Sequence, residues 1–414
     1  MPKTDHANAD DEPVPRKPAP LADKKLTTPQ MKEKLAPPPV ARTEFESIAL
    51  LLQGGGALGA YQAGVYEALA EADIAPDWVG GISIGSINGA IIAGNKPADR
   101  VAKLRGFWDK ITANPLLDQF SAFTPGARQG GDVMRTFWNN MSASMAMCSG
   151  VPGFFRPHLL PPFMMPPGSP ASTSYYDTAG FQKTLEEFID FDRLNSRETR
   201  YTISAVDVRS GNYTIFENLT CKITPQHIMA SGALPPALPA IEIDGEFYWD
   251  GGLISNTPLE WIMHDATKDT LVFQVDLWSA KGEYPKDMLE VMTRMKEIQY
   301  SSRTRAMTDR LKRAQKLRHA FSSLYEKLPE ELQKSAEAEI LNAASDYNVY
   351  NIVHLIYRAR LYEGYSKDYE FSRASMEEHW KSGYNDTVKS LEHKEILKKP
   401  DCPEGIMVYD VAGA

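Results

Sequence analysis

Cysteines are few in this sequence, long apolar runs are absent, and no histidine stands where a catalytic triad would need one. The three cysteines, Cys148, Cys221 and Cys402, are far apart and form no C-x-x-C pair. This spacing argues against a disulfide framework or a structural zinc site and favours a reducing compartment. No apolar run approaches the ~18 residues of a membrane span, and the first residues lack the apolar core of a secretory signal. We therefore expect a cytoplasmic protein whose membrane association, if any, is peripheral.

Charge and composition exclude further classes. The 414 residues carry a net charge of −9, which disfavours wholesale nucleic-acid binding. With 43% hydrophobic and 24% charged residues the chain is of ordinary globular composition, and its length predicts two or three domains. Residues 1–43 are rich in Pro, Lys, Ala and Asp and nearly devoid of aromatic residues. Such a segment cannot bury enough apolar surface to offset its ordering entropy, so we predict a disordered tail.

Two short apolar runs separated by a helical pattern predict a parallel sheet. The first run, Ser47 to Leu52, leads into a glycine-rich loop and then into apolar residues at helical spacing from Ala60 onward. The second run, Trp78 to Ile82, follows that helix. Two strands joined through a helix imply parallel pairing with helices on the faces of the sheet. We predict an α/β fold over residues 44–280, with a mostly parallel central sheet flanked by helices.

Later segments predict further strands. Arg200 to Val208 and Asn212 to Glu217 alternate apolar and polar residues around a turn, which is typical of a hairpin. Ile241 to Asp250 is predicted to form a second hairpin around an Asp-Gly turn. Leu271 to Trp278 has the composition of a buried strand.

A G-x-S-x-G pattern stands at the end of the second predicted strand. It comprises Gly81, Ser83 and Gly85 and is followed by small residues typical of a helix. In a nucleophile elbow the serine occupies a tight strand-to-helix turn, and a Cβ on either glycine would collide with neighbouring backbone. The pattern therefore predicts that the Ser83 hydroxyl is a nucleophile; a plain loop of small residues is the alternative.

The glycine loop after the first strand has three interpretations. Gly54, Gly56 and Gly59 fit the G-x-G-x-x-G dinucleotide fingerprint, but the second strand does not end in the acidic residue that this reading needs. No Lys-Ser/Thr pair closes the loop, so a P-loop is excluded. The favoured interpretation is an oxyanion hole formed by the backbone amides of Gly54, Gly55 and Gly56. A tight turn without further function is the remaining alternative.

A serine nucleophile needs a base, and Asp250 is the candidate. None of the eight histidines follows an acid at a strand end, where a triad histidine would be expected. Asp250 ends a predicted strand, and Gly251 and Gly252 would let the backbone pack against a neighbouring loop. A carboxylate next to Ser83 could accept its proton directly. On local sequence alone, an ordinary turn is the favoured interpretation of Asp-Gly-Gly.

Two segments could contact lipid. Residues 151–170 contain too many prolines for a helix or central strand, and they are too apolar for an ordinary solvated loop. They are expected either to cover the core or to line the mouth of an apolar pocket. Residues 286–319 contain ten Lys/Arg and four Asp/Glu, a balance of +6, in a helical pattern. Its apolar positions favour a packed helix with a solvated basic face, and an anionic-membrane or partner-binding helix is the alternative. The apolar positions of this helix are Met288, Val291, Met292, Met295 and Ile298.

Three motifs together resemble the signatures of patatin-like phospholipases. They are LLQGGGALGAYQAGV, GISIGSINGA and YWDGGLISNTPL, and they occur in the order that this family shows. Asp250 follows Ser83 by 167 residues, an interval that the family tolerates. Ser231 to Pro239 is similar to the segment before the family's D-G-G turn. The resemblance covers about Phe45 to Ala280.

The resemblance implies an α/β fold related to other lipid hydrolases, a Ser83–Asp250 dyad without histidine, and an oxyanion hole from the glycine loop. Gly59, Gly81, Gly85, Gly251 and Gly252 would support these motifs. It implies a lipid ester substrate and no metal or cofactor. The sequence departs at Leu58, where many members carry a cation, so no phosphate-binding role is expected there. Residues 281–414 resemble the helical extension of a bacterial subset. A catalytically idle lipid-binding or regulatory protein of the same fold is an alternative, and a dinucleotide-binding oxidoreductase is a less favoured one.

Overall fold

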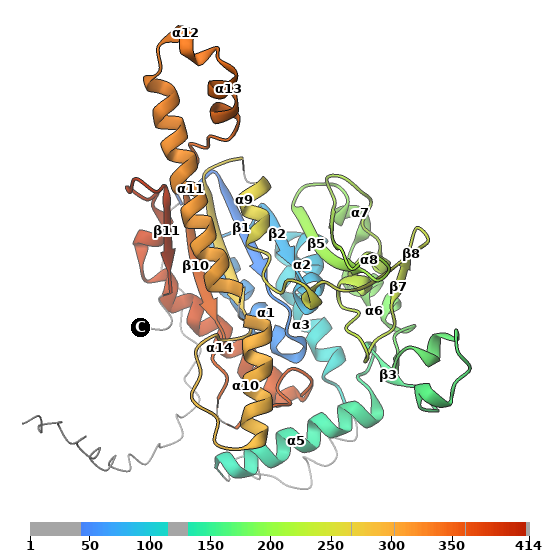
Figure 1. The fold of residues 1–414 in the computed structure, drawn as a ribbon. Coiled ribbons are helices and arrows are strands. Elements are labelled where there is room, and N and C mark those ends of the chain that lie inside the picture. Colours follow the sequence, from blue (N-terminus) through green and yellow to red (C-terminus); the bar gives the residue numbers. More distant parts are fainter. Residues whose placement is uncertain (1–42, 115–130, 266, 302, 361, 411–414) are drawn as a thin grey trace, which may run out of the picture. The chain divides into compact units, whose positions relative to one another are not determined.

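The computed structural model describes residues 43–114, 131–265, 267–301, 303–360 and 362–410 (Figure 1). The tail predicted for residues 1–43 lies, except for its last residue, outside the described residues. The described residues belong to a single unit.

A nine-stranded sheet forms the centre of the described residues, with the order β11-β10-β9-β1-β2-β5-β8-β7 and with β6 paired to β5. The strands are β1 Ser47–Leu52, β2 Trp78–Gly81, β5 Arg200–Asp207, β6 Tyr213–Glu217, β7 Ile241–Ile243, β8 Glu246–Asp250, β9 Thr270–Asp276, β10 Tyr350–Ile356 and β11 Ile406–Tyr409. A separate pair consists of β3 Arg156–Pro157 and β4 Tyr176–Asp177.

Strand pairing confirms the predicted fold class. β1 is parallel to both β2 and β9, and β2 is parallel to β5. The two predicted hairpins are present as the antiparallel pairs β5–β6 and β7–β8. β8 also pairs antiparallel to β5 and thereby joins the second hairpin to the parallel part of the sheet.

Helices cover both faces of the sheet. Successive side chains of β1 point to opposite faces and therefore pack against different helices. Leu50 and Leu52 belong to a buried cluster with residues of α1 Ala60–Glu71, α2 Ile84–Ala93 and α3 Pro97–Ile111. Leu51 belongs to a second cluster on the opposite face, with residues of α9 Glu260–Asp265 and α11 Arg303–Lys327. A strand buried on both faces explains the uninterrupted apolar run.

The C-terminal residues are helical, as predicted, but they also extend the sheet. β10 pairs in parallel with β9, and β11 pairs in parallel with β10. α14 Arg373–Leu391 packs closely against α1 because Gly64 and Gly383 lie at the crossing; a Cβ on Gly64 would stand 1.8 Å from the Trp380 carbonyl oxygen. The sequence changes near residue 280 from an α/β pattern to a mainly helical one, but strands from both sides of this point belong to one continuous sheet. The strands were not predicted because polar residues interrupt the apolar pattern of β10.

The remaining helices lie outside this sheet (Figure 1). They are α5 Asp132–Ser149, α6 Phe181–Phe188, α7 Phe191–Leu194, α8 Pro225–Ser231, α10 Met288–Ser301, α12 Glu330–Gln333 and α13 Ala336–Ala343. Of these, α12 and α13 stand at the far end of α11, away from the strands (Figure 1). Short 3₁₀ helices span Gly56–Gly59, Pro162–Met164, Pro170–Ser172, Gly251–Leu253 and Lys394–Leu397. Among the described helices, none combines the length and apolar character needed to cross a bilayer.

The basic segment 286–319 forms parts of two helices with different environments. α11 packs against the sheet through buried Met307 and Leu311. On α10, by contrast, Met288 is 72% exposed and Met295 is 61% exposed. The prediction that these apolar positions pack against the protein is therefore wrong for α10. Helical spacing shows that apolar residues share a face, but it does not say whether the protein covers that face.

Candidate active site

Ser83 lies in a strained turn between β2 and α2. Its backbone angles, φ 55° and ψ −125°, are rarely adopted by residues other than glycine. A Cβ on Gly81 would stand 2.2 Å from the Gly85 carbonyl oxygen, and one on Gly85 would stand 2.2 Å from the Leu52 carbonyl oxygen. The turn thus has the predicted geometry of a nucleophile elbow, and both glycines are sterically required.

Strand register brings Asp250 level with Ser83. Gly81 of β2 pairs with Ile203 of β5, so Ser83 follows at the level of Ala205. Ala205 pairs in turn with Asp250 at the end of the antiparallel strand β8. Two residues that are distant in the sequence therefore meet at the same edge of the sheet.

The Asp250 carboxyl is buried beside the Ser83 hydroxyl. Asp250 is only 2% exposed. Its carboxylate accepts a hydrogen bond from the Gly252 amide at 2.7 Å, and the Ser83 side chain is close enough to influence its pKa. Burial raises the pKa of Asp250 to about 7, although the Ser83 side chain and the Gly252 amide act to lower it. A carboxyl group that titrates near neutral pH is suited to accept a proton from a bound hydroxyl.

The glycine loop packs directly against Ser83. A Cβ on Gly54 would stand 3.0 Å from the Ser83 Cβ. The Gly54 amide donates to Asn256 Oδ1 at 3.0 Å, and the Gly54 carbonyl oxygen accepts from Asn256 Nδ2 and Trp278 Nε1. Neither Asn256 nor Trp278 was predicted as a site residue. Asn256 lies four residues beyond the Asp-Gly-Gly turn, within the third motif, and that position was the available signal.

Gly55 and Gly56 keep their amides available. Within the described residues, no hydrogen-bond acceptor is found for either N–H group. Gly56 has a φ of +55°, and a Cβ there would stand 2.1 Å from the Asp368 carbonyl oxygen. That oxygen accepts a 2.8 Å hydrogen bond from the Ala57 amide. The C-terminal segment around Asp368 thus holds the glycine loop in place.

The other motif glycines sit at close crossings. A Cβ on Gly59 would stand 2.4 Å from Ile84 Cγ1, and a Cβ on Gly251 would stand 2.4 Å from Ser204 Oγ. The segment that begins at Ser231 also contacts the elbow, because Ser231 Oγ accepts a hydrogen bond from the Ser83 amide at 3.2 Å. Each motif therefore contributes backbone or side-chain contacts to one site.

A cavity of about 360 Å³ opens at Ser83 and Asp250. Its lining includes the glycine loop, Ser83 and Asp250, and most of its other residues are apolar or aromatic. Tyr300 of α10 and the C-terminal residues Tyr365, Asp368 and Tyr369 form part of the wall. These four residues were not predicted, because no motif accompanies them in the sequence.

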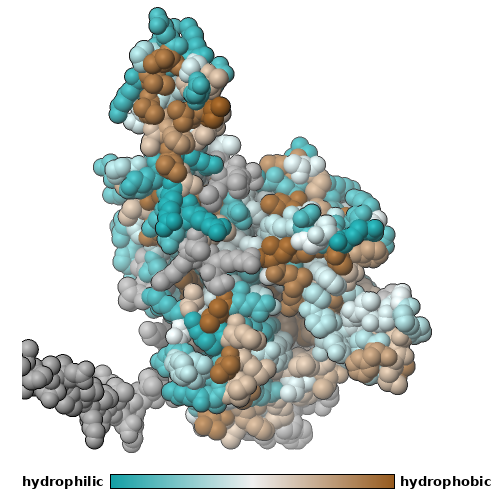
Figure 2. Space-filling model, viewed as in Figure 1, coloured by the Kyte–Doolittle hydropathy of each residue, from teal (hydrophilic) through white to brown (hydrophobic). Residues whose placement is uncertain are grey.

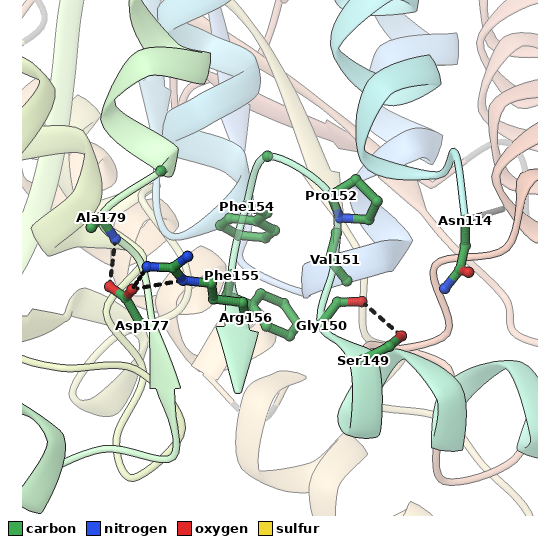
Figure 3. Close-up of a pocket in the computed structure, with 12 residues that line it drawn as sticks. Asn114, Ser149, Gly150, Val151, Pro152, Phe154, Phe155, Arg156, Asp177 and Ala179 are labelled. Atoms are coloured by element: carbon green, nitrogen blue, oxygen red, sulfur yellow. Dashed lines mark hydrogen bonds and ion pairs between the residues drawn. The ribbon is translucent and has the colours of Figure 1, made fainter. Parts of the chain in front are cut away.

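The proline-rich segment 151–170 contributes both to packing and to the cavity. Phe154 and Phe155 line the cavity, and both rings contact the Phe371 ring. The same two residues also border a neighbouring cavity of about 560 Å³, shown in Figure 3. Neither Ser83 nor Asp250 lines that cavity; its most prominent polar feature is the ion pair between Arg156 and Asp177.

Histidines and metal-binding clusters are absent from this site as far as the described residues go. No described histidine lines the cavity. His354 is buried beside Asp276, with 3.3 Å between Nδ1 and Oδ2, and His227 caps α8. The described part of the chain contains no group of three His, Cys, Asp or Glu side chains that could hold a metal ion.

Two family models match the sequence. The model described as "Patatin-like phospholipase" matches residues 50–261, about half of the chain. A second, described as "Patatin phospholipase", matches residues 298–402, which contain most of the C-terminal helices and β10.

Similar curated proteins are much longer than this chain. "Neuropathy target esterase sws" from Drosophila melanogaster is 42% identical over 220 residues, covering 53% of this chain and 12% of the fly protein. Human "Patatin-like phospholipase domain-containing protein 6" is 44% identical over 75 residues, covering 17% of this chain and 6% of the human protein. The chain therefore spans only a small part of the length of these relatives.

Among solved structures, VipD from Legionella pneumophila is 15% identical with a TM-score of 0.40, covering 89% of this chain and 72% of VipD. The type III effector ExoU is 14% identical with a TM-score of 0.29, covering 87% of this chain and 54% of ExoU. Likenesses this distant do not assign a function.

Proposed function

Because the chain belongs to the patatin-like phospholipase family, we propose that it is a serine hydrolase of lipid carboxylic esters. The observation that carries this proposal is the buried Asp250 carboxyl next to the Ser83 hydroxyl, because burial raises the pKa of that carboxyl to about 7. The mostly apolar lining of the cavity suits a fatty acyl chain.

In the proposed acylation step, Ser83 Oγ attacks the ester carbonyl carbon while Asp250 accepts the hydroxyl proton. The carbonyl oxygen becomes an oxyanion in the tetrahedral intermediate. We assign its stabilisation to the Gly55 and Gly56 amides, because the Gly54 amide already donates to Asn256. Collapse of the intermediate breaks the ester bond, and Asp250 returns the proton to the leaving alkoxide.

Deacylation reuses the same groups. Water gives its proton to Asp250 and attacks the acyl carbon, and the second tetrahedral intermediate again places its oxyanion at the glycine loop. Its breakdown releases the fatty acid and returns the proton to Ser83. These steps need only side chains and amides that are present at the site.

The alternatives fit the site less well. A dinucleotide fingerprint needs an acidic residue at the end of the second strand, but β2 ends at Gly81 and leads into Ser83. An idle lipid-binding protein would have no need of a serine in strained backbone geometry beside a buried carboxyl.

Activity should depend on pH through Asp250. The proposed base must be ionised, so hydrolysis should fall as pH drops below the raised pKa of about 7. We expect kcat/KM for a phosphatidylcholine or short-chain ester substrate to rise about tenfold per pH unit below pH 7 and to level off above it. Fatty acid release measured from pH 5 to 9 tests both the activity and its base. A rate that stays flat down to pH 5 would exclude Asp250 as the base.

We further propose that apolar residues around the cavity bind the lipid surface that supplies the substrate. Figure 2 shows hydrophobic surface along α5 and α10 on the face in view. α5 reaches the cavity through Met147, and α10 reaches it through Tyr300. In the proline-rich segment, Leu159 is 98% exposed and Phe163 is 81% exposed. Because these elements meet at the cavity, membrane contact would place ester groups next to the dyad.

Removing part of this apolar surface should weaken membrane binding. We expect the double variant Leu159→Ser, Phe163→Ser to bind phosphatidylcholine vesicles at least about tenfold more weakly, because each side chain loses about 1.5–3 kcal/mol of apolar burial in the bilayer. Vesicle co-sedimentation measures the effect, and hydrolysis of a soluble short-chain ester checks that the cavity is intact. The matched control is Leu332→Ser, which removes an exposed leucine from α12. Equal binding of the double variant and the control would contradict the proposed surface.

A further inference from the structure

A second cleft has a basic lining, and some of its residues adjoin residues of the catalytic cavity in the sequence. It has a volume of about 520 Å³ and lies between the loop 279–286, the adjoining turns of α10 and the segment 358–367. It shares no lining residue with the cavity that contains Ser83. Neither the motifs nor the proposed hydrolysis uses it.

The lining of this cleft is strongly positive for a chain of net charge −9. Three glutamates line it, against six cationic side chains. The cationic residues are Lys281, Lys286, Arg294, Arg358, Arg360 and Lys367. A local excess of three positive charges in a concave site concentrates anions.

The inner cations are already paired, whereas several outer ones are not. Glu297 bridges Arg294 at 3.1 Å and Lys367 at 2.5 Å. No carboxylate of the described chain forms an ion pair with Lys281, Lys286 or Arg360, and all three residues are exposed. Lys281 and Lys286 thus retain their capacity to bind a ligand, as does Arg360, which forms no ion pair with a described residue although Glu378 and Glu363 interact with its charge. The inner pairs fix the shape of the cleft.

We propose that this cleft binds a phosphate group, carried either by a lipid headgroup or by a soluble compound. A phosphate monoester carries about −1.5 to −2 charges and three acceptor oxygens, which fits three unpaired cations around one cleft. The guanidinium of Arg360 can bind two of these oxygens, and the two ammonium groups can bind as point charges. A monocarboxylate would leave most of the excess positive charge unbalanced.

The cleft adjoins the residues that hold the glycine loop. Ser279 of the cleft follows Trp278, whose indole N–H donates to the Gly54 carbonyl oxygen at 2.9 Å. Lys367 of the cleft precedes Asp368, whose carbonyl oxygen accepts the Ala57 amide. A bound phosphate would draw the two cationic walls together and hold both contacts in place. Phosphate binding is therefore expected to raise the rate of hydrolysis, a consequence that rests on the proposed function.

Binding is tested on the full chain carrying Ser83→Ala, so that the result does not depend on hydrolysis. Titration calorimetry with inorganic pyrophosphate should show saturable binding at one site. The double variant Lys281→Ala, Arg360→Ala should raise Kd at least about tenfold, because it removes two charge-assisted contacts. The control Lys312→Ala, Arg313→Ala removes the same charge from the exposed side of α11 and should bind as tightly as the parent. Unchanged thermal midpoints without ligand establish that each variant is folded.

Vesicles distinguish the two sources of phosphate. Co-sedimentation compares phosphatidylcholine vesicles with and without phosphatidic acid. It is carried out with the Ser83→Ala parent, the cleft double variant and the α11 control. Pyrophosphate binding that is lost only in the cleft variant supports the site with a soluble ligand. Binding seen only on phosphatidic acid vesicles, and lost only in the cleft variant, supports it with a lipid headgroup. No binding in either assay, or equal losses in the control, overturns the proposal. An activity assay of the chain with native Ser83, with and without pyrophosphate, then tests the coupling separately.

Discussion

Replacing Ser83 by alanine is expected to reduce kcat for ester hydrolysis by about 10⁵–10⁶-fold, to the residual level that binding and oxyanion stabilisation provide without a nucleophile. The side chain is only partly buried, and the substitution leaves the elbow backbone unchanged. The thermal midpoint should therefore change little. Initial rates of fatty acid release at saturating substrate measure the loss.

Ser196→Ala is the matched control for this variant. Ser196 is an exposed serine after α7 and contacts no residue of the cavity. It should retain full activity. If Ser83→Ala kept more than a few per cent of the native rate, another residue would have to be the nucleophile.

Replacing Asp250 by asparagine is expected to have two opposite effects. Hydrolysis should fall about 10⁴-fold or more, because an amide cannot accept the Ser83 proton. Stability should rise, because the buried carboxylate is held ionised at a cost in the native protein. Loss of activity together with a gain in stability is the combination that a merely structural aspartate would not produce.

The stability gain has a defined pH dependence. The pKa of Asp250 is raised in the folded chain, from 3.8 to about 7. A raised carboxyl pKa contributes stability below the unfolded pKa, and that contribution is lost as pH rises through the folded pKa. The shift corresponds to at most about 4 kcal/mol above pH 7. Asp250→Asn should therefore raise the thermal midpoint by several degrees at pH 8 and hardly at all at pH 4.

Asp244→Asn provides the control in the same hairpin. Asp244 lies exposed in the β7–β8 turn with a φ of 51°, a conformation that asparagine also tolerates. It should change neither the rate nor the thermal midpoint at either pH. A midpoint of Asp250→Asn that is lower than native at pH 8 would contradict the raised pKa.

Local sequence was sufficient to predict the elements that position Ser83 and Asp250. The apolar runs that became β1 and β2 are buried on both faces of the sheet, and such strands carry a signal that needs no tertiary information. The two hairpins followed from alternation and from the Asp-Gly turn. Ser83 and Asp250 were both predicted, but the reason that they meet lies in strand register. Register depends on pairing across the sheet, which the sequence specifies only indirectly.

The walls of the site could not be predicted in the same way. Tyr300, Tyr365 and Asp368 come from a region without glycine motifs, and their place depends on β10 joining the sheet beside β9. Whether the Gly54 amide is free to bind an oxyanion also depended on a tertiary contact. Asn256 binds both backbone groups of Gly54, so the predicted three-amide oxyanion hole becomes a proposed pair.

Covalent labelling of the nucleophile tests the central claim most directly. A fluorophosphonate ester reacts with an activated serine, and peptide mass spectrometry locates the adduct. The Ser83–Asp250 pair predicts a single adduct on Ser83, formed in step with the loss of hydrolysis and more slowly below pH 7, where Asp250 becomes protonated. An adduct on another residue that accounts for the lost activity, or full hydrolysis with Ser83 unlabelled, would contradict the account.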